Sequence, residues 1–268
     1  MANPSEAPPG PSLELQRRYR ASDLAVFTDE EARRFVGDGI GDPQTDLELA
    51  WELLYRREPE LYDRLADAER LHPGVLAWLP HRVGRIVEVG AGTGRLTLEL
   101  ARRADELMAI EPAAPLRAIL SQRLARSVHG GQPVVGRQPV ISGGFFDRLP
   151  VGDAWADLVV TCSAFTPSPG HGGEAGLAEM ERVCKPGGLV VIVWPNHLEW
   201  LTTRGYRYRC FAGDVFVEFP SHLDAVELSE IFYPAAAAAV RRSGGRRFSY
   251  EALGINAPRD VAFKGMAA

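Results

Sequence analysis

Three glycines stand at alternate positions, Gly90, Gly92 and Gly94, between an apolar run and a segment with helical periodicity. The apolar run, 86–89, predicts a buried strand, and residues 96–101 predict a helix. A strand, a glycine turn and a helix together bring bare backbone against a ligand and direct helix N–H groups towards its polar end. The spacing therefore predicts a site for a nucleotide-like ligand.

Two carboxylates flank this turn in a pattern that suits such a ligand. Glu88 lies inside the apolar run, where a carboxylate needs a partner. Glu111 ends a second apolar run about 20 residues beyond the turn, where nucleotide-binding α/β folds hold ribose hydroxyls. We therefore expect both side chains to face the ligand. The alternative for each is an ordinary charge at a strand end or in a solvated loop.

Two short motifs narrow the choice of ligand. The GxGxxG pattern of dinucleotide-binding domains would need a glycine at the position of Arg95. Here an acid precedes GxGxG instead, and a Lys-Pro-Gly-Gly turn between a helix and an apolar strand follows at 185–188. In both motifs the chain resembles the class I S-adenosylmethionine-dependent methyltransferases.

The resemblance spans residues 85–194. It implies a doubly wound, mostly parallel seven-stranded sheet that binds S-adenosylmethionine. It also implies that Glu88 orients the ammonium group of the cofactor, directly or through water, and that Glu111 holds the ribose. The other residues expected around the cofactor are Gly90, Ala91, Gly92, Thr93, Gly94, Pro112 and Cys162. A nicotinamide enzyme is the distant alternative.

The adenine end of the expected site departs from the family. Many members have an acidic residue four positions before a Leu-Pro pair, and here that position is Phe145. We expect Phe145 or Phe146 to cover the adenine face and Asp147 to make the polar contact. The alternative is that each phenylalanine belongs to the core.

Two histidines are candidates for a catalytic base, which a hydroxyl acceptor usually needs. His197 follows the fifth predicted strand and is the first candidate, because histidine titrates near neutral pH. His171 lies after the fourth predicted strand and is the second. The alternative for each is an ordinary loop histidine.

Aromatic and arginine side chains interleave beyond the fifth strand. They are Trp194, Trp200, Tyr206, Tyr208 and Phe211 with Arg204, Arg207 and Arg209. This composition favours equally a pocket wall for an aromatic or anionic small molecule and a packed surface flap.

Alternating strand and helix patterns predict the order of elements. Strands are expected near 85–90, 107–111, 139–143, 156–162 and 188–194, and helices near 94–104, 113–127, 173–184 and 221–241. Two closing strand patterns, 246–252 and 259–264, predict an antiparallel hairpin that completes the sheet.

The same patterns divide the chain into parts. Residues 1–12 predict a disordered tail, because proline and small polar residues bury little surface. Residues 13–80 predict a helical cap, and 81–268 the methyltransferase domain, with 195–220 as an insertion on the acceptor side. We expect the cap and the insertion to close over the carboxyl edge of the sheet, where ligands bind. Asp157 belongs to the opposite edge and is expected to be structural.

Composition excludes several classes of protein. The chain is 46% apolar and 24% charged, with a formal charge of −5 and no long basic run, which disfavours nucleic acid as a partner. Cys162, Cys184 and Cys210 form no CxxC pair, so neither a zinc site nor a disulfide framework is expected. No apolar run approaches the roughly 20 residues that span a bilayer. The first residues lack an apolar signal core, so the cytoplasm is the default compartment.

The sequence thus predicts an S-adenosylmethionine-dependent methyltransferase that acts on a small molecule, with oxygen as the preferred acceptor atom and no metal. An acceptor in protein or RNA is one alternative. The other is a non-catalytic module that retains the fold for binding the cofactor or a partner.

Overall fold

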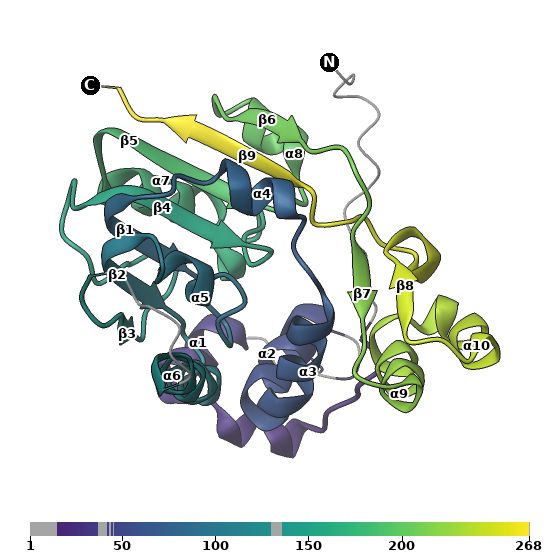
Figure 1. The fold of residues 1–268 in the computed structure, drawn as a ribbon. Coiled ribbons are helices and arrows are strands. Elements are labelled where there is room, and N and C mark those ends of the chain that lie inside the picture. The colour runs from purple at the N-terminus through teal and green to yellow at the C-terminus, as the bar shows by residue number, and fades with distance from the viewer. Residues whose placement is uncertain (1–14, 37–41, 43, 45, 130–135, 268) are drawn as a thin grey trace. The chain divides into compact units, whose positions relative to one another are not determined.

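The computed structural model describes residues 15–36, 42, 44, 46–129 and 136–267. The tail predicted at 1–12 lies outside these residues. Contacts divide the chain into two compact units (Figure 1). The sheet unit comprises Leu71–Asp214 and Pro258–Ala268, and the helical unit comprises Pro11–Arg70 and Val215–Ala257. The helical unit thus takes its residues from two separate stretches of the chain.

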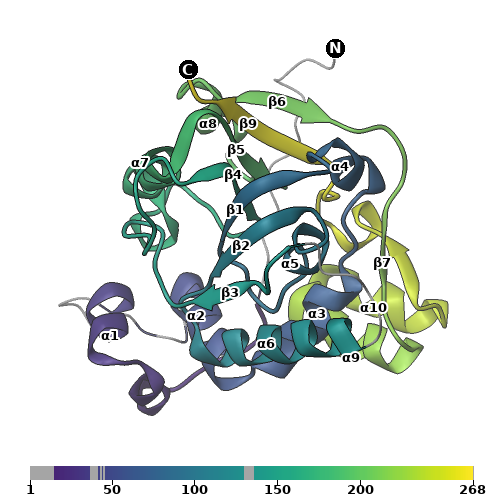
Figure 2. The ribbon, with the colours of Figure 1, turned by 60° about the vertical axis from the view of Figure 1, so that its left-hand side comes forward.

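A seven-stranded sheet with the order β3-β2-β1-β4-β5-β9-β6 forms the sheet unit (Figure 2). Its strands are β1 (Val83–Val89), β2 (Ala104–Ile110), β3 (Val140–Ser142), β4 (Ala156–Cys162), β5 (Cys184–Val193), β6 (Arg207–Cys210) and β9 (Asp260–Gly265). The strands β1 to β5 pair in parallel, β9 is antiparallel to β5, and β6 is antiparallel to β9. The predicted α/β class with a mostly parallel, seven-stranded sheet is confirmed.

Helices lie on both faces of this sheet (Figure 1). They are α4 (Pro73–Trp78), α5 (Thr97–Leu100), α6 (Ala114–His129), α7 (Gly173–Val183) and α8 (Leu198–Thr202), with a 3-10 helix at Pro169–His171. Met180 of α7 and Leu201 of α8 share a core cluster with Ile192 of β5. On the other face, the ring of Trp78 in α4 lies 5.0 Å from that of Phe263 in β9. The sheet is therefore doubly wound, and its central strands are buried on both faces as parallel strands generally are.

The helix predicted at 94–104 is wrong in length, because α5 covers only Thr97–Leu100. The N–H of Val83 donates to the carbonyl of Arg103 at 2.9 Å, so residue 103 already pairs with the first strand. The next strand starts at Ala104. The connection between these two strands therefore leaves no room for a longer helix.

Short helices and a two-stranded sheet make up the helical unit. They are 3-10 helices at Ala21–Val26 and Glu251–Leu253, and α1 (Asp29–Phe35), α2 (Leu47–Arg57), α3 (Pro59–Ala68), β7 (Phe216–Glu218), α9 (His222–Phe232), α10 (Pro234–Ser243) and β8 (Arg247–Ser249). The single helix predicted at 221–241 is in fact two helices. Pro234 begins the second of them, because proline has no N–H to continue a helix but fits its first turn.

A buried ionic cluster joins α1 to α2 within the helical unit. The guanidinium of Arg56 donates to Glu31 at 2.7 and 2.9 Å and to Glu52 at 2.5 Å. It also lies 5.1 Å from the ring centres of Phe27 and Phe35. Removing one partner from such a cluster would leave an uncompensated buried charge, so these contacts fix how α1 packs on α2.

The last strand of the sheet has partners other than those predicted. β9 lies between β5 and β6, and β8 pairs with β7 in the helical unit instead. Val261 and Ala262 of β9 are fully buried, whereas the alternating arginines of β6, Arg207 and Arg209, suit an exposed edge. The antiparallel end of the sheet is confirmed, but its edge strand comes from the segment after β5 and not from 246–252.

Candidate active site

The glycine turn follows β1 and adopts backbone conformations that favour glycine. The φ angles of Gly90, Gly92 and Gly94 are +72°, +56° and +102°. The N–H groups of Gly90 and Ala91 both donate to the carbonyl of Ile110, at 2.9 and 3.0 Å. The turn is therefore held against the carboxyl end of β2.

Glu111 connects this turn to the segment after β2. Its buried carboxylate accepts hydrogen bonds from the N–H of Gly92 at 2.9 Å and from that of Ala113 at 2.8 Å. The carbonyl of Pro112, the residue after Glu111, accepts a hydrogen bond from the guanidinium of Arg117 at 2.7 Å. A carboxylate oxygen can accept more than one hydrogen bond, which binding of a ribose hydroxyl would require. The ribose role stays a prediction, and the structure adds a clamp on the glycine turn.

Glu88 is buried, and its Oε2 atom has no hydrogen-bond partner. Burial raises the pKa of this carboxyl to about 8; the Thr97 hydroxyl opposes the rise and the negative charge of Glu111 adds to it. Thr93, within the glycine turn, is also buried with an unpartnered hydroxyl. A cationic ammonium group would supply the donor that Glu88 lacks and lower its pKa. The residues present therefore fit the amino-acid end of S-adenosylmethionine.

Phe146 is the member of the predicted adenine group that reaches the glycine turn. A Cβ added at Gly90 would lie 3.4 Å from the Phe146 ring and 2.7 Å from the Cβ of Ala164. Phe146 also packs edge-on against Phe165, with ring centres 5.1 Å apart. Phe145 bridges to Arg148 within a tight turn, and Asp147 is exposed. The adenine roles of these residues stay predictions.

Two non-glycine residues with left-handed backbone lie side by side where β4 and β5 end. Ser163 and Trp194 have φ angles of +55° and +56°, and the N–H of Ser163 donates to the carbonyl of Val193 at 3.0 Å. Cys162, half-buried, is the last residue of β4 and pairs with Val193. Such conformations cost about 1–3 kcal/mol each and cluster at functional sites. They mark this edge as a candidate for the acceptor side.

The two candidate histidines follow these same strands. His197 is exposed and precedes the first residue of α8. His171 is half-buried at the end of the 3-10 helix, where its carbonyl accepts from the N–H of Thr166 at 3.0 Å. The catalytic role of each stays a prediction.

One carboxylate at this edge was not among the residues predicted from the sequence. Asp260 begins β9, and its backbone carbonyl accepts from the N–H of Trp194 at 3.0 Å. Its side chain is buried: Oδ2 accepts from the hydroxyl of Tyr208 at 2.9 Å, and Oδ1 has no partner. Burial raises the pKa of this carboxyl to about 6. An acid at the start of an apolar strand was the available signal, but its place depends on the direction of β9.

The aromatic and arginine segment after β5 makes many internal contacts. Arg204 lies 4.4 Å from the ring centre of Trp200, and Arg209 lies 5.2 Å from that of Phe211. Trp200 in turn packs 5.9 Å from Phe165 of the core. These are the contacts of a packed flap, one of the two interpretations that the composition favoured equally.

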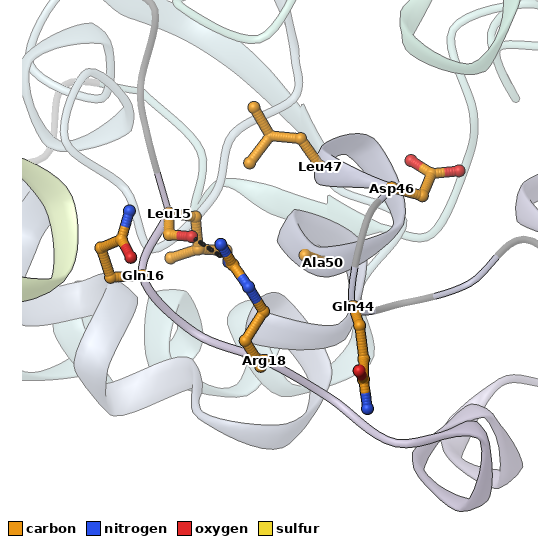
Figure 3. Close-up of a pocket in the computed structure, with 7 residues that line it drawn as sticks. All are labelled: Leu15, Gln16, Arg18, Gln44, Asp46, Leu47 and Ala50. Carbon is orange, nitrogen blue, oxygen red and sulfur yellow. Dashed lines mark hydrogen bonds between the residues drawn. The ribbon is translucent and has the colours of Figure 1, made fainter.

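A small cavity of about 230 Å³ lies in the helical unit (Figure 3). Its lining residues are Leu15, Gln16, Arg18, Gln44, Asp46, Leu47 and Ala50. Arg18 donates to the carbonyl of Leu15 at 2.7 Å, and Asp46 caps α2 through the N–H of Leu49. Its charged groups thus serve local structure, and none of the predicted site residues lines it.

Two kinds of feature are missing from the part of the chain that the structure describes. No group of three or more His, Cys, Asp or Glu side chains there is placed to hold a metal ion. Nor is any helix there long and apolar enough to cross a membrane.

Comparisons with known proteins concern the domain that holds this site. Residues 87–192 match the family model described as a methyltransferase domain. An uncharacterized methyltransferase of Geobacillus kaustophilus is 28% identical over 154 residues, which are 57% of this chain and 66% of that protein. One of Mycobacterium tuberculosis is 28% identical over 139 residues, half of each chain. The matched region thus spans between half and just under two thirds of these relatives.

Among solved structures, the chain is similar to a candidate methyltransferase of Haloferax volcanii, solved in complex with the Trm112 methyltransferase activator. The identity is 17%, the TM-score is 0.48, and the match covers 81% of this chain and 95% of that one. The family match runs from β1 to β5 and includes the glycine turn and its two carboxylates, so residues 87–192 form a methyltransferase domain of the class I, S-adenosylmethionine-dependent type.

Proposed function

We propose that this protein transfers a methyl group from S-adenosylmethionine to an oxygen atom of a small molecule. One observation carries the proposal. In the sheet unit, buried side-chain oxygens without a partner gather where β1, β4 and β5 end and β9 begins. They belong to Glu88, Thr93, Thr97, Thr161, Asn196 and Asp260. Buried polar groups are normally hydrogen-bonded, so a cluster of unsatisfied ones at one edge indicates a place that a ligand completes.

The donor half of the site would use the groups around the glycine turn. Glu88 would bind the ammonium group, backbone of the turn would lie against the amino-acid end, and Glu111 would hold the ribose. When bound, S-adenosylmethionine supplies a sulfonium methyl group: the acceptor atom bonds to that carbon, the carbon–sulfur bond breaks, and its electron pair stays on sulfur. Alignment of the two reactants would supply most of the lowering of the activation barrier, on the order of 7–11 kcal/mol.

The acceptor half would use the edge of β4, β5 and β9. The unpartnered atoms there include carboxylate and amide oxygens of Asp260 and Asn196, which accept hydrogen bonds. They call for an acceptor molecule that donates one, as a hydroxyl does. The formal charge of −5 and the absence of a basic run favour a small molecule over nucleic acid. We also propose that the part of the predicted 195–220 insertion that belongs to the sheet unit, residues 195–214, covers this acceptor side as a packed flap.

A paired measurement tests this proposal. Isothermal titration of the full chain with S-adenosylhomocysteine and with NADH identifies the cofactor. Transfer of tritium from methyl-labelled S-adenosylmethionine is then measured to hydroxyl compounds (catechol, resorcinol, 4-nitrophenol), to amines (aniline, benzylamine), and to total protein and total RNA.

We expect binding of S-adenosylhomocysteine and label in the hydroxyl compounds. Tighter binding of NADH than of S-adenosylhomocysteine would contradict the assignment of S-adenosylmethionine as the cofactor. Tritium found only in protein or RNA would show that the acceptor is a macromolecule and not a small molecule. Binding of S-adenosylhomocysteine without any methyl transfer would indicate a non-catalytic module.

A further inference from the structure

Asp260 lies at the ligand edge of the sheet because β9 runs against β5. The carboxyl end of β5 therefore meets the amino end of β9, where Val193 pairs with Val261 and the N–H of Trp194 donates to the carbonyl of Asp260. One strand further, Ser163 donates to the carbonyl of Val193. A continuous row of hydrogen bonds thus connects Asp260 to the end of β4.

The two carboxylate oxygens of Asp260 have different environments. Oδ2 accepts from Tyr208 of β6 at 2.9 Å, whereas Oδ1 has no partner although the residue is only 8% exposed. A carboxylate oxygen that is desolvated and unpaired lowers the stability of the folded protein. A structural tie between β9 and β6 accounts for Oδ2 and leaves Oδ1 unexplained.

We propose that Asp260 binds the hydroxyl group of the methyl acceptor through Oδ1 and takes its proton, while Tyr208 holds the carboxylate in place through Oδ2. The inference rests on the proposed function, since it names the residue that receives the proton lost by the acceptor oxygen. That proton leaves as the oxygen bonds to the methyl carbon, and the protonated carboxyl then returns it to solvent. Atoms and charge therefore balance without a metal or a second cofactor.

The chemistry of the group supports this role. A base works best when its pKa lies near the working pH, and burial raises the pKa of Asp260 to about 6 from an ordinary value of 3.8. Tyr208, the cation of Arg259 and the backbone N–H of Asp260 itself oppose this rise. Burial raises the pKa of Tyr208, and Cys210 on the same strand adds to that rise. His197, the base predicted from the sequence, is exposed instead. A buried carboxylate excludes water from the proton transfer more fully than an exposed imidazole.

Three variants of the full chain test the inference. Asp260→Asn removes the base and keeps the volume, and Tyr208→Phe removes only the donor to Oδ2. Asp157→Asn is the matched control, because it changes an aspartate at the opposite edge of the same sheet. For each, the melting temperature and the affinity for S-adenosylhomocysteine are measured first. Transfer of the tritiated methyl group to catechol, resorcinol and 4-nitrophenol is then followed from pH 5 to 9.

We expect all three variants to fold and to bind S-adenosylhomocysteine as the wild type does. Asp260→Asn should lower kcat/KM by about 100-fold or more, in the range of lost general-base catalysis. Tyr208→Phe should lower it by about tenfold. It should also move the acidic limb of the pH profile upwards, because the carboxylate loses a hydrogen bond that favours its ionised form. Asp157→Asn should leave both rate and profile unchanged.

Other outcomes overturn the inference. Wild-type rates in Asp260→Asn would exclude the residue as the base, as would an acidic limb that Tyr208→Phe does not move. Binding of S-adenosylhomocysteine with transfer to aniline or benzylamine only would exclude a hydroxyl acceptor while the methyltransferase function stands. Failure of the wild type to bind S-adenosylhomocysteine would instead overturn the proposed function itself.

Discussion

The two edges of the same sheet treat their carboxylates in opposite ways. At the amino edge, Asp157 accepts from the N–H of Arg85 at 2.8 Å and pairs with Lys185. Partial burial opposes them, but these two partners hold the pKa of Asp157 below its ordinary value. At the carboxyl edge, burial raises the pKa of both Glu88 and Asp260, and each has an oxygen without a partner.

This contrast separates architecture from function within one sheet. An acid that the protein itself satisfies stabilises the fold, whereas an acid left desolvated and unpaired lowers stability until a ligand supplies the donor. Ligands of open α/β sheets bind at the carboxyl edge, which agrees with where the unsatisfied groups lie. This contrast can therefore be tested by making the same type of substitution at the amino edge and at the carboxyl edge of the sheet.

The largest effect is expected for Glu111→Ala. Two backbone N–H groups, on Gly92 and Ala113, would lose a charged acceptor. The ribose would also lose the partner that we propose for it. Since hydrogen bonds to charged groups are worth about 1.5–3 kcal/mol each, affinity for S-adenosylhomocysteine should fall by at least 100-fold, measured by isothermal titration. Glu111→Gln keeps one acceptor oxygen, so its affinity should lie between those of the wild type and Glu111→Ala. Unchanged affinity in Glu111→Ala would remove this residue from the site.

A pair of glycine substitutions compares the edges next. Gly90 at the carboxyl edge and Gly187 at the amino edge have nearly equal φ angles, +72° and +75°. A Cβ at Gly90 would lie 2.7 Å from that of Ala164, whereas one at Gly187 meets nothing within 4 Å. Gly187→Ala should therefore cost about 1–2 kcal/mol of unfolding free energy from strain alone. Gly90→Ala should cost about 3 kcal/mol, because overpacking adds to the strain. Equal losses in urea denaturation would contradict the close approach at Gly90.

The pH dependence of stability should show the raised pKa of Glu88. Its folded pKa of about 8 exceeds the ordinary value of 4.5, so between these values the folded chain keeps a proton that the unfolded chain has lost. Stability of the wild type relative to Glu88→Gln should therefore fall as pH rises through this window, by about 2 kcal/mol between roughly pH 6 and 8. Urea denaturation of both chains over this range measures the difference. A difference independent of pH would contradict the raised pKa.

The sequence predicts the core strands well because their signal is local. Continuous apolar runs mark β1, β2, β4 and β5, and the glycine turn stands where spacing and composition place it. The Lys-Pro-Gly-Gly turn is similarly recognisable from its residue types alone. In the structure it bulges out between the pairs Ala156↔Cys184 and Leu158↔Leu189 at the amino edge. These features need no knowledge of which strands become neighbours.

The rest of the site depends on pairings that no local pattern carries. Asp260 reaches the ligand edge only because β9 inserts antiparallel between β5 and β6, and the sequence pattern pairs that strand with 246–252 instead. Phe146, not Phe145, faces Gly90 because of how a tight turn directs its side chains. Tyr208 becomes a partner of Asp260 through the same insertion.

The smallest effect, and the opposite pH dependence, is expected for Asp157→Asn at the amino edge. Because the folded pKa of Asp157 is lowered, its stabilising contribution is present above its ordinary value of 3.8 and is lost as pH falls through the folded pKa. The side chain is 29% exposed, so solvent screening should limit the loss at neutral pH to about 1 kcal/mol or less. Wild type and variant should therefore converge in stability as the solution becomes acidic. As pH falls, the wild type should gain stability relative to Glu88→Gln. Over the acidic range it should lose stability relative to Asp157→Asn. If both pairs changed in the same direction, the contrast between a satisfied and an unsatisfied edge would fail.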